Sequence, residues 1–359
     1  MRRFVGVLLV LVGLLMGAID SEAAPSPKLY VCNQGEATVS IIDMDSMVVE
    51  TTVDLTEHGF SENAKPHHVV AEADGAHWYV TLIGANTILK FNRENEIVGR
   101  LSAFEVPGLL AIDTASDRLY AGRSMSAVDP PKSVGVIDRR TMTLTDEIDT
   151  FFPRPHSLVV ADDGAHAFVA SLATNQLMGI DTASGETTLT RLGGTTQTLV
   201  QFAMTPDGST LLGGGQRTGQ LLLFDATNAP SLTVTDTLQV GREPWHPVIS
   251  GDGTTAYVPN KRSHSVSVVD LTNAGVTTTI EGPGLAQPHG TALSPDGRYL
   301  FVSNNNRDGT YTPSGDNPKA GTVTVIDTET NEVVDVIEAG TYPTGIGTFG
   351  GQRAVARDE

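Results

Sequence analysis

Short stretches in which hydrophobic and polar residues alternate recur along most of the chain, and Gly, Asp and Pro interrupt them. In the clearest copies a Pro begins an apolar run, an Asp-Gly pair follows eight residues later, and a second apolar run comes next. Period-two alternation indicates half-buried strands, and Asp-Gly between two of them indicates a tight hairpin. Equivalent positions lie 41 to 48 residues apart, at 74, 115, 163, 207, 252 and 296. This regularity predicts an all-β repeat protein.

A further alternating stretch in each repeat ends in Asp or Asn. The seven ends are Asp43, Asn92, Asp138, Asp181, Asp225, Asp270 and Asp327. The segment from Lys28 lacks an innermost strand, whereas the segment from Thr341 supplies one and nothing after it. Pairing the two would close a ring and remove exposed sheet edges. The predicted fold is an all-β, seven-bladed β-propeller with four-stranded blades, closed between the C-terminal strand and the N-terminal half-blade.

The N-terminus has a different pattern. Arg2 and Arg3 precede an apolar run from Val5 to Ile19, and small residues follow it, which is the layout of a secretory signal peptide. The alternative is an anchor that stays attached, although the run is short for a membrane span. We expect a signal peptide over 1–23, the propeller over 24–351 and a C-terminal tail over 352–359. The protein would then be periplasmic or secreted, with no stable membrane insertion after cleavage.

Charge and cysteine content narrow the function. The formal net charge is -19, which opposes binding to nucleic acid or an anionic membrane and favours a soluble monomer. Cys32 is the single cysteine, so no internal disulfide is possible, and its place in the apolar run LYVCN predicts a buried side chain.

Five of the nine histidines fall in one narrow position of the repeat. His67, His156 and His289 directly follow the repeat Pro, and His68 and His246 lie one residue further on. In a propeller this is where the chain returns from an outer strand to the next inner strand, so we expect these side chains around one mouth of the central channel. Neutral imidazoles grouped about an axis predict a site for copper, iron or zinc. The alternative is that they pack and bond to the backbone.

Basic residues and long loop insertions are predicted on the same face of the propeller as the five histidines. Arg154, Arg217 and Arg262 lie beside the strand starts or in the loops above them, and 10 of the 21 Lys and Arg residues that remain without Arg2 and Arg3 lie there. Because arginine suits carboxylate and phosphate groups, these cations predict an anionic ligand. We therefore name His67, His156, His289, Arg154, Arg217 and Arg262 as candidate cofactor-binding residues.

The repeat resembles the YVTN β-propeller family, for which YVTLIGANTILKFN from Tyr79 is a close local match. That resemblance implies the fold and leaves the function open. At the histidine positions the chain is similar to two redox groups of the propeller superfamily. The haem d1 propellers of cytochrome cd1 nitrite reductases imply an axial ligand at His67, His156 or His289. The nitrous oxide reductase propeller implies a copper cluster held by histidines, including a pair like His67 and His68.

The chain departs from both redox groups. It has no CxxCH motif and no paired cysteines, hence no electron-transfer module of its own. We first expect a binding protein for an anionic small molecule, a metal or a tetrapyrrole, with copper or a haem d1-like group as the cofactor. The alternatives are a cofactor-free scaffold for another exported protein or a cell-surface polymer, and a redox enzyme with a separate electron donor. No catalytic residue can be assigned, so enzyme activity stays open, and a non-enzyme is favoured.

Overall fold

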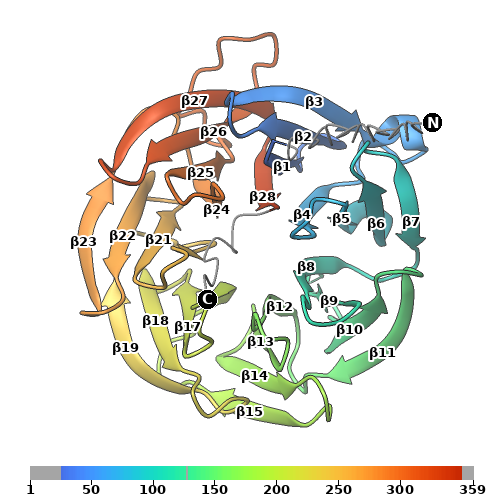
Figure 1. Cartoon of the computed structure of the whole chain (residues 1–359), viewed down its shortest axis with the longest axis vertical. Helices are drawn as coiled ribbons and strands as arrows, with labels where there is room; N and C mark the ends of the chain where they lie inside the picture. The colour runs from blue at the N-terminus through green and yellow to red at the C-terminus, as the bar shows by residue number, and fades with distance from the viewer. Residues whose placement is uncertain (1–25, 127, 350–359) are drawn as a thin grey trace, which may run out of the picture.

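Seven four-stranded antiparallel sheets surround a central axis in the computed structural model, which describes residues 26–126 and 128–349 (Figure 1). This arrangement confirms the predicted seven-bladed β-propeller. The predicted signal peptide and C-terminal tail lie outside the described residues. The described ranges include two 3-10 helices, η1 (Leu55–His58) and η2 (Ile83–Ala85). In these same ranges no helix has the length and apolar character needed to cross a membrane.

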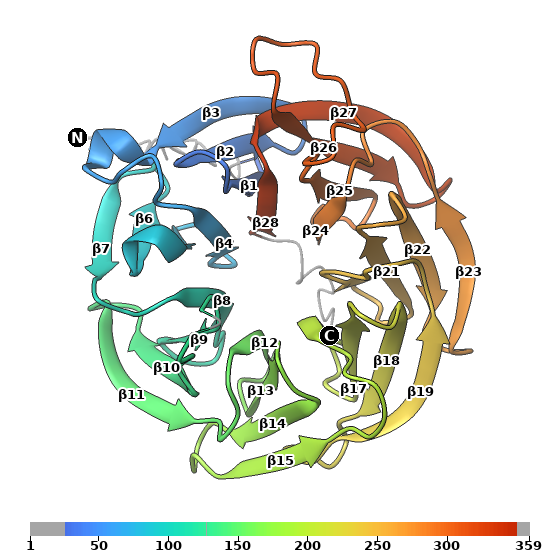
Figure 2. The same cartoon turned by 180° about the vertical axis from the view of Figure 1, so that it is seen from behind.

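Each blade contributes one strand to each of four concentric positions (Figures 1 and 2). The inner strands are β28 (Pro343–Thr348), β4 (Pro66–Ala71), β8 (Pro107–Ile112), β12 (Pro155–Val160), β16 (Leu199–Met204), β20 (Val248–Ile249) and β24 (Pro288–Leu293). The second strands are β1 (Lys28–Asn33), β5 (His77–Leu82), β9 (Arg118–Arg123), β13 (His166–Ser171), β17 (Thr210–Gly215), β21 (Thr255–Asn260) and β25 (Tyr299–Asn304).

The third strands are β2 (Thr38–Asp43), β6 (Thr87–Asn92), β10 (Ser133–Asp138), β14 (Gln176–Asp181), β18 (Gln220–Asp225), β22 (Ser265–Asp270) and β26 (Ala320–Asp327). The outer strands are β3 (Val48–Asp54), β7 (Ile97–Leu101), β11 (Thr143–Asp149), β15 (Thr187–Arg191), β19 (Thr233–Gln239), β23 (Gly275–Ile280) and β27 (Glu332–Thr341). The middle strands are almost wholly buried because both of their faces pack on neighbouring blades, whereas most residues of the outer strands are exposed.

The first blade is assembled from both ends of the chain. Strand β28 pairs antiparallel with β1, and Tyr30 lies opposite Gly347. The Thr348 hydroxyl donates to the Lys28 carbonyl over 2.8 Å. This pairing is the predicted closure, and it gives β1 a partner on its inner edge.

Short polar turns join the strands as the sequence predicts. In the β4–β5 hairpin Gly75 has a φ of 66°, and the Asp74 carboxylate accepts the Ala76 backbone N–H over 2.9 Å. Between β14 and β15 the Asp181 carboxylate accepts the Ser184 backbone N–H over 2.8 Å. The repeated Asp residues are therefore turn formers, because their side chains bond the backbone two or three residues on.

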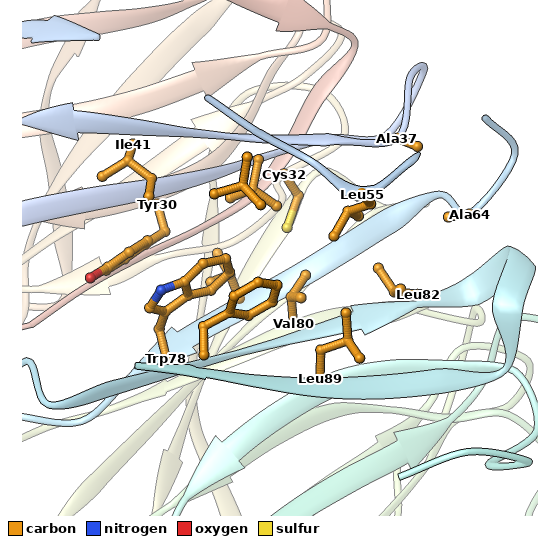
Figure 3. Close-up of a cluster of buried hydrophobic side chains, with 14 residues drawn as sticks. Tyr30, Cys32, Ala37, Ile41, Leu55, Ala64, Trp78, Val80, Leu82 and Leu89 are labelled. Atoms are coloured by element: carbon orange, nitrogen blue, oxygen red, sulfur yellow. The ribbon is translucent and has the colours of Figure 1, made fainter. Parts of the chain in front are cut away.

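The hydrophobic core lies between adjacent blades. In the cluster between the first two blades, Trp78 stacks on Phe91 with ring centroids 4.0 Å apart and on Tyr30 with centroids 5.0 Å apart (Figure 3). Cys32 is fully buried in this cluster, as predicted, and burial raises the pKa of its thiol. Such packing holds neighbouring blades together and fixes the inner strands around the axis.

Candidate functional site

A repeated turn directs the chain to the axis before each inner strand. The residue ahead of the strand has a left-handed backbone in all seven blades, with φ between 42° and 60° at Lys65, Val106, Arg154, Thr198, Glu243, Gln287 and Tyr342. Its carbonyl accepts a backbone N–H from just beyond the second strand of the same blade. For example, the Ile83 N–H donates to Lys65 over 3.1 Å, and the Lys261 N–H donates to Glu243 over 2.8 Å. The residues that follow this turn are therefore held at fixed positions near the axis.

The five predicted histidines meet in one cluster, which we call the histidine cluster: His67, His68, His156, His246 and His289. Ring centroids lie 4.8 Å apart for His246 and His289 and 5.8 Å apart for His67 and His156. The His68 and His246 centroids lie 6.1 Å apart. All five side chains are buried, with exposed fractions of 3–6%. These residues were expected around one mouth of the central channel, and in the structure their side chains are covered from solvent.

Three of the rings are oriented by partners outside the cluster. His156 Nδ1 lies 2.6 Å from the Ser124 hydroxyl, and His67 Nδ1 lies 3.1 Å from the Gln34 side-chain nitrogen. His68 Nδ1 accepts the Leu110 backbone N–H over 3.1 Å. Gly108 makes room for the Ser124 contact, because a Cβ at that position would overlap the Ser124 hydroxyl.

Several ring nitrogens in the cluster have no partner. His67 Nε2, His246 Nε2 and His289 Nδ1 are buried and make no hydrogen bond among the described residues. Leaving a buried polar atom unsatisfied costs about 1–3 kcal/mol, and native proteins contain few such atoms. Two of them lie on the neighbouring rings of His246 and His289, which marks the cluster as a place where a ligand would supply the missing contacts.

Burial keeps the cluster neutral. It lowers the pKa of His67 to about 4, with a smaller contribution from the Lys261 ammonium. Burial together with His67 lowers the pKa of His68 to about 3. Burial also lowers the pKa of His156, His246 and His289 well below the usual value. At neutral pH each ring therefore carries one N–H and one lone pair, which is the form that binds metals.

Trp245 and Lys261 cover one side of the cluster. The Trp245 ring lies 4.9 Å from the His289 ring, and Lys261 Nζ lies 4.4 Å from the Trp245 ring centroid. Burial and the nearby Arg307 lower the pKa of Lys261 to about 8. The half-buried Trp245 therefore packs directly on the cluster and carries the Lys261 ammonium on its ring.

The three predicted arginines have different surroundings. Arg154 is half-buried, and its Nε donates to the Ser124 carbonyl over 2.9 Å, so it supports the residue that contacts His156. Arg262 is exposed, and its Nε lies 3.0 Å from the Glu243 carboxylate. Arg217 is exposed between β17 and β18. The structure thus joins Arg154 to the cluster through Ser124, while Arg217 and Arg262 lie at the surface.

A cavity of about 280 Å³ follows the axis between the inner strands of all seven blades, and we call it the channel cavity. His68 and Pro247, both buried, lie at one end. Ala73, Thr114 and Asp162 lie at the other end, where they are exposed in the turns that follow the inner strands. The channel cavity therefore opens on the Asp-Gly hairpin face. The candidate histidines and basic residues of the sequence analysis were expected on the opposite face, where the inner strands begin.

The donor set suits a metal, but the rings do not form a finished coordination sphere. Within residues 26–126 and 128–349, no group of three or more His, Cys, Asp or Glu side chains is arranged to hold a metal ion. Two imidazoles that share one ion at about 2.0–2.1 Å have ring centroids roughly 5–6 Å apart. The observed separations of 4.8–6.1 Å match that pairwise spacing. A two-histidine site therefore needs only small ring movements, and a larger one needs side-chain rotation.

Sequence reasoning missed Trp245, Ser124 and Gln34 as parts of the site. Trp245 follows Pro244 at the same repeat position as His67, His156 and His289, so alignment of the repeats could have found it. Ser124 and Gln34 follow second strands and reach the axis only because the turn described above joins the end of the second strand to the start of the inner one. Their side chains carry no sequence signal of that contact.

Fold and site together define a seven-bladed β-propeller with a histidine cluster across its axis. No family model matches the chain. A curated relative is Antigen Lp49 of Leptospira interrogans serogroup Icterohaemorrhagiae serovar copenhageni (strain Fiocruz L1-130), 27% identical over 245 residues. The match covers 66% of this chain and 42% of the antigen, so this chain spans less than half the length of that relative.

Solved structures share the fold at low identity. A functionally unknown protein from Desulfotomaculum acetoxidans DSM 771 has a TM-score of 0.72 and 14% identity, over 90% of this chain and 99% of that one. Kuenenia stuttgartiensis hydrazine synthase has a TM-score of 0.66 and 16% identity, over 80% and 90%. Dihydro-heme d1 dehydrogenase NirN in complex with DHE has a TM-score of 0.63 and 15% identity, over 92% and 77%. At these identities the likeness to NirN and to the other two structures is one of fold.

Proposed function

We propose that this protein is an exported binding protein that holds a transition-metal ion, copper by preference, in the histidine cluster. One observation carries the proposal. His246 Nε2 and His289 Nδ1 are both buried and unpartnered among the described residues, and they belong to rings whose centroids lie 4.8 Å apart. An ion between two neutral imidazoles would satisfy both nitrogens at once.

The chemistry of the donors favours copper. Imidazole suits copper, zinc, iron and nickel, and Cu(II) has the highest affinity of the divalent first-row series for a given set of ligands. His67 has an unpartnered Nε2, and His156 lies 5.8 Å from it with its Nδ1 beside the Ser124 hydroxyl. A ligating histidine usually gives its other N–H to an oxygen, which is the role that Ser124 fits. We therefore assign His246 and His289 as the first ligands and His67 and His156 as the next.

His68 has a different role in this proposal. Its Nδ1 lone pair accepts the Leu110 N–H, so the hydrogen of the neutral ring lies on Nε2. A nitrogen that carries a hydrogen cannot ligate a metal. His68 therefore serves as a hydrogen-bond donor beside the metal ligands unless the Leu110 contact is broken.

The test is copper binding by purified full-length protein. Cu(II) competition against a chromophoric chelator, with metal analysis by mass spectrometry, should give about one copper per chain. The variant H246F/H289F should lose at least 100-fold in affinity. The matched control H77F/H166F removes two histidines of the second strands β5 and β13, outside the cluster, and it should bind copper normally. Equal affinity in the two double variants would overturn the assignment.

A tetrapyrrole is the second candidate. It is supported by the fold shared with NirN, a structure in complex with DHE, and by the exposed Arg217 and Arg262. A propionate-bearing ring would take one imidazole as its axial ligand and pair its carboxylates with these arginines. Added haem would then give a Soret band that R217Q/R262Q weakens. Protein that binds neither haem nor copper would favour a cofactor-free interaction scaffold.

Export forms part of the proposal and has its own test. The antigen name of the Leptospira relative is compatible with an exported chain. N-terminal sequencing of protein recovered from the exported fraction should begin near Ala24. A chain that retains Met1 would contradict cleavage.

A further inference from the structure

The channel cavity has walls that differ sharply from the histidine cluster beside it. Most of the residues that line it are aliphatic, and the half-buried Val70, Ile112, Val159 and Met204 are among them. Each inner strand is also the edge of its sheet, so backbone N–H and C=O groups add polar surface. Among the described lining residues the charged one is Asp162, at the exposed end. Such a surface favours neutral ligands that are partly apolar, because an anion would lose its hydration here without gaining an opposite charge.

His68 and Gln201 are two of the polar side chains that line the channel cavity. His68 lies at the inner end, and with Nδ1 engaged by the Leu110 N–H its donor is Nε2–H. Gln201 occupies in its own repeat the position that His68 occupies in another, but its Oε1 atom is itself buried. The channel cavity therefore offers the His68 Nε2–H as a hydrogen-bond donor, whereas the Gln201 acceptor is not exposed to it.

We propose that the channel cavity is a separate binding site for a small, neutral, mainly apolar molecule that carries a hydroxyl or amide group. The molecule enters from the Asp-Gly hairpin face and accepts a hydrogen bond from His68 Nε2–H. This site needs no metal, so it stands apart from the proposed copper function. Where copper is bound, the two ligands meet at His68, whose ring lies 6.1 Å from that of His246.

The volume limits the size of the ligand. An apolar cavity of about 150 Å³ accommodates benzene, so a cavity near twice that size takes one substituted aromatic ring or a branched alcohol. A tetrapyrrole is much larger than this and would have to bind elsewhere. Anions are disfavoured, because Asp162 lies at the mouth and the neutral histidines supply no compensating charge.

The experiment measures binding of three probes to full-length protein in EDTA, by isothermal titration calorimetry and ligand-observed NMR. p-Cresol has the required hydroxyl, p-xylene replaces that hydroxyl with a methyl group, and benzoate carries a negative charge. We expect saturable p-cresol binding about fivefold tighter than p-xylene binding, since one net hydrogen bond contributes about 1 kcal/mol. Benzoate should show no saturable binding.

Two variants locate the site. H68F keeps an aromatic ring and removes the donor, so it should reduce the p-cresol preference by at least half and leave p-xylene binding within twofold. A203F fills the cavity from the half-buried Ala203 and should abolish binding of both neutral probes. H166F, on β13 outside the cavity, is the matched control and should behave as wild type. Circular dichroism checks that each variant is folded.

Three outcomes would overturn the proposal. They are no saturable binding of either neutral probe to folded wild-type protein, p-cresol binding that survives A203F, and benzoate binding as tight as that of p-cresol. Because all titrations contain EDTA, failure here leaves the copper proposal standing. If the protein binds no copper, the proposal for the channel cavity likewise still stands.

Discussion

The Leu110 backbone N–H donates to His68 Nδ1 over 3.1 Å, which links the inner strands β8 and β4 of neighbouring blades. Because an amide nitrogen can only donate, this contact fixes the hydrogen of His68 on Nε2. Protonation of His68 would have to break the contact as well as place a charge in a buried cluster. Both effects oppose protonation of His68, and the pKa of this ring is correspondingly low, about 3.

Acid should destabilise the protein in a window set by the histidines. The pKa of His67 is about 4 when folded, whereas an unfolded histidine has a pKa of about 6.5, so the unfolded chain binds more protons between these values. The free energy of unfolding should be constant above about pH 7 and fall as the pH drops from 6.5 towards 4, by up to about 1.4 kcal/mol per pH unit for each such histidine. Urea denaturation at pH 7.5, 6.0 and 5.0 measures this.

The variant H67Q tests the source of that slope. It should reduce the fall between pH 6.5 and 5 by the contribution of one histidine. Buried or hydrogen-bonded carboxylates such as Asp181, whose pKa is lowered by the Ser184 hydrogen bonds, lose their stabilising effect only below about pH 4. An unchanged slope in H67Q would show that His67 does not contribute to the acid sensitivity.

Ser124 should position His156 for metal binding. Its hydroxyl lies 2.6 Å from His156 Nδ1, and loss of such a partner typically costs 10–100-fold in metal affinity. S124A should therefore weaken copper binding by about tenfold or more. S171A is the matched control, because Ser171 is equally buried and its hydroxyl donates to the Pro153 carbonyl without touching a histidine. Equal copper affinity in the two variants would remove His156 from the site.

The Lys261–Trp245 stack should report pH through fluorescence. Trp78 and Trp245 are the two tryptophans, so W78F leaves Trp245 as the sole emitter. The pKa of Lys261 is about 8, and loss of its charge 4.4 Å from the ring should shift the emission with a midpoint near pH 8. K261M should abolish the transition, and K65M, at an exposed lysine, should keep it. A transition that persists in K261M would assign it to another group.

Gly345 should be intolerant of a side chain. A Cβ there would overlap the His67 carbonyl oxygen and lie 2.7 Å from His68 Cα, and neither backbone atom can move freely. G345A should lower the free energy of unfolding by about 1–3 kcal/mol. G251A is the control, because no heavy atom lies within 4 Å of its Cβ, and it should raise stability by about 0.4–1 kcal/mol. Urea denaturation gives both values, and a change in the free energy of unfolding with the same sign in G345A and G251A would contradict the packing argument.

The fold could be predicted from the sequence because each local signal agreed with the others. The repeat spacing, the Asp-Gly hairpins and the split blade between Lys28 and Thr348 all required one closed ring, and the structure has it. The same repeat spacing also predicted that His67, His156 and His289 lie close together, since equivalent repeat positions meet at the axis.

Burial and access could not be predicted in the same way. The left-handed turn before each inner strand draws the histidines inward, and a left-handed backbone at residues such as Lys65 or Glu243 has no clear sequence signature. The roles of Trp245 and Ser124 depend on contacts between blades rather than on sequence spacing. Charge counting also overstated the basic face, because Arg154 and Arg262 bond to neighbouring groups.

The closing strand has a consequence for the order in which the protein becomes functional. The Thr344 hydroxyl lies 3.3 Å from the His67 carbonyl, so part of the wall beside the cluster is made of residues synthesised after every histidine in it. A ribosome-bound or truncated chain that stops before Pro343 has all five imidazoles but no complete ring to hold them. The ring that surrounds the histidine cluster is therefore complete only after the strand Pro343–Thr348 has been made and has paired with β1.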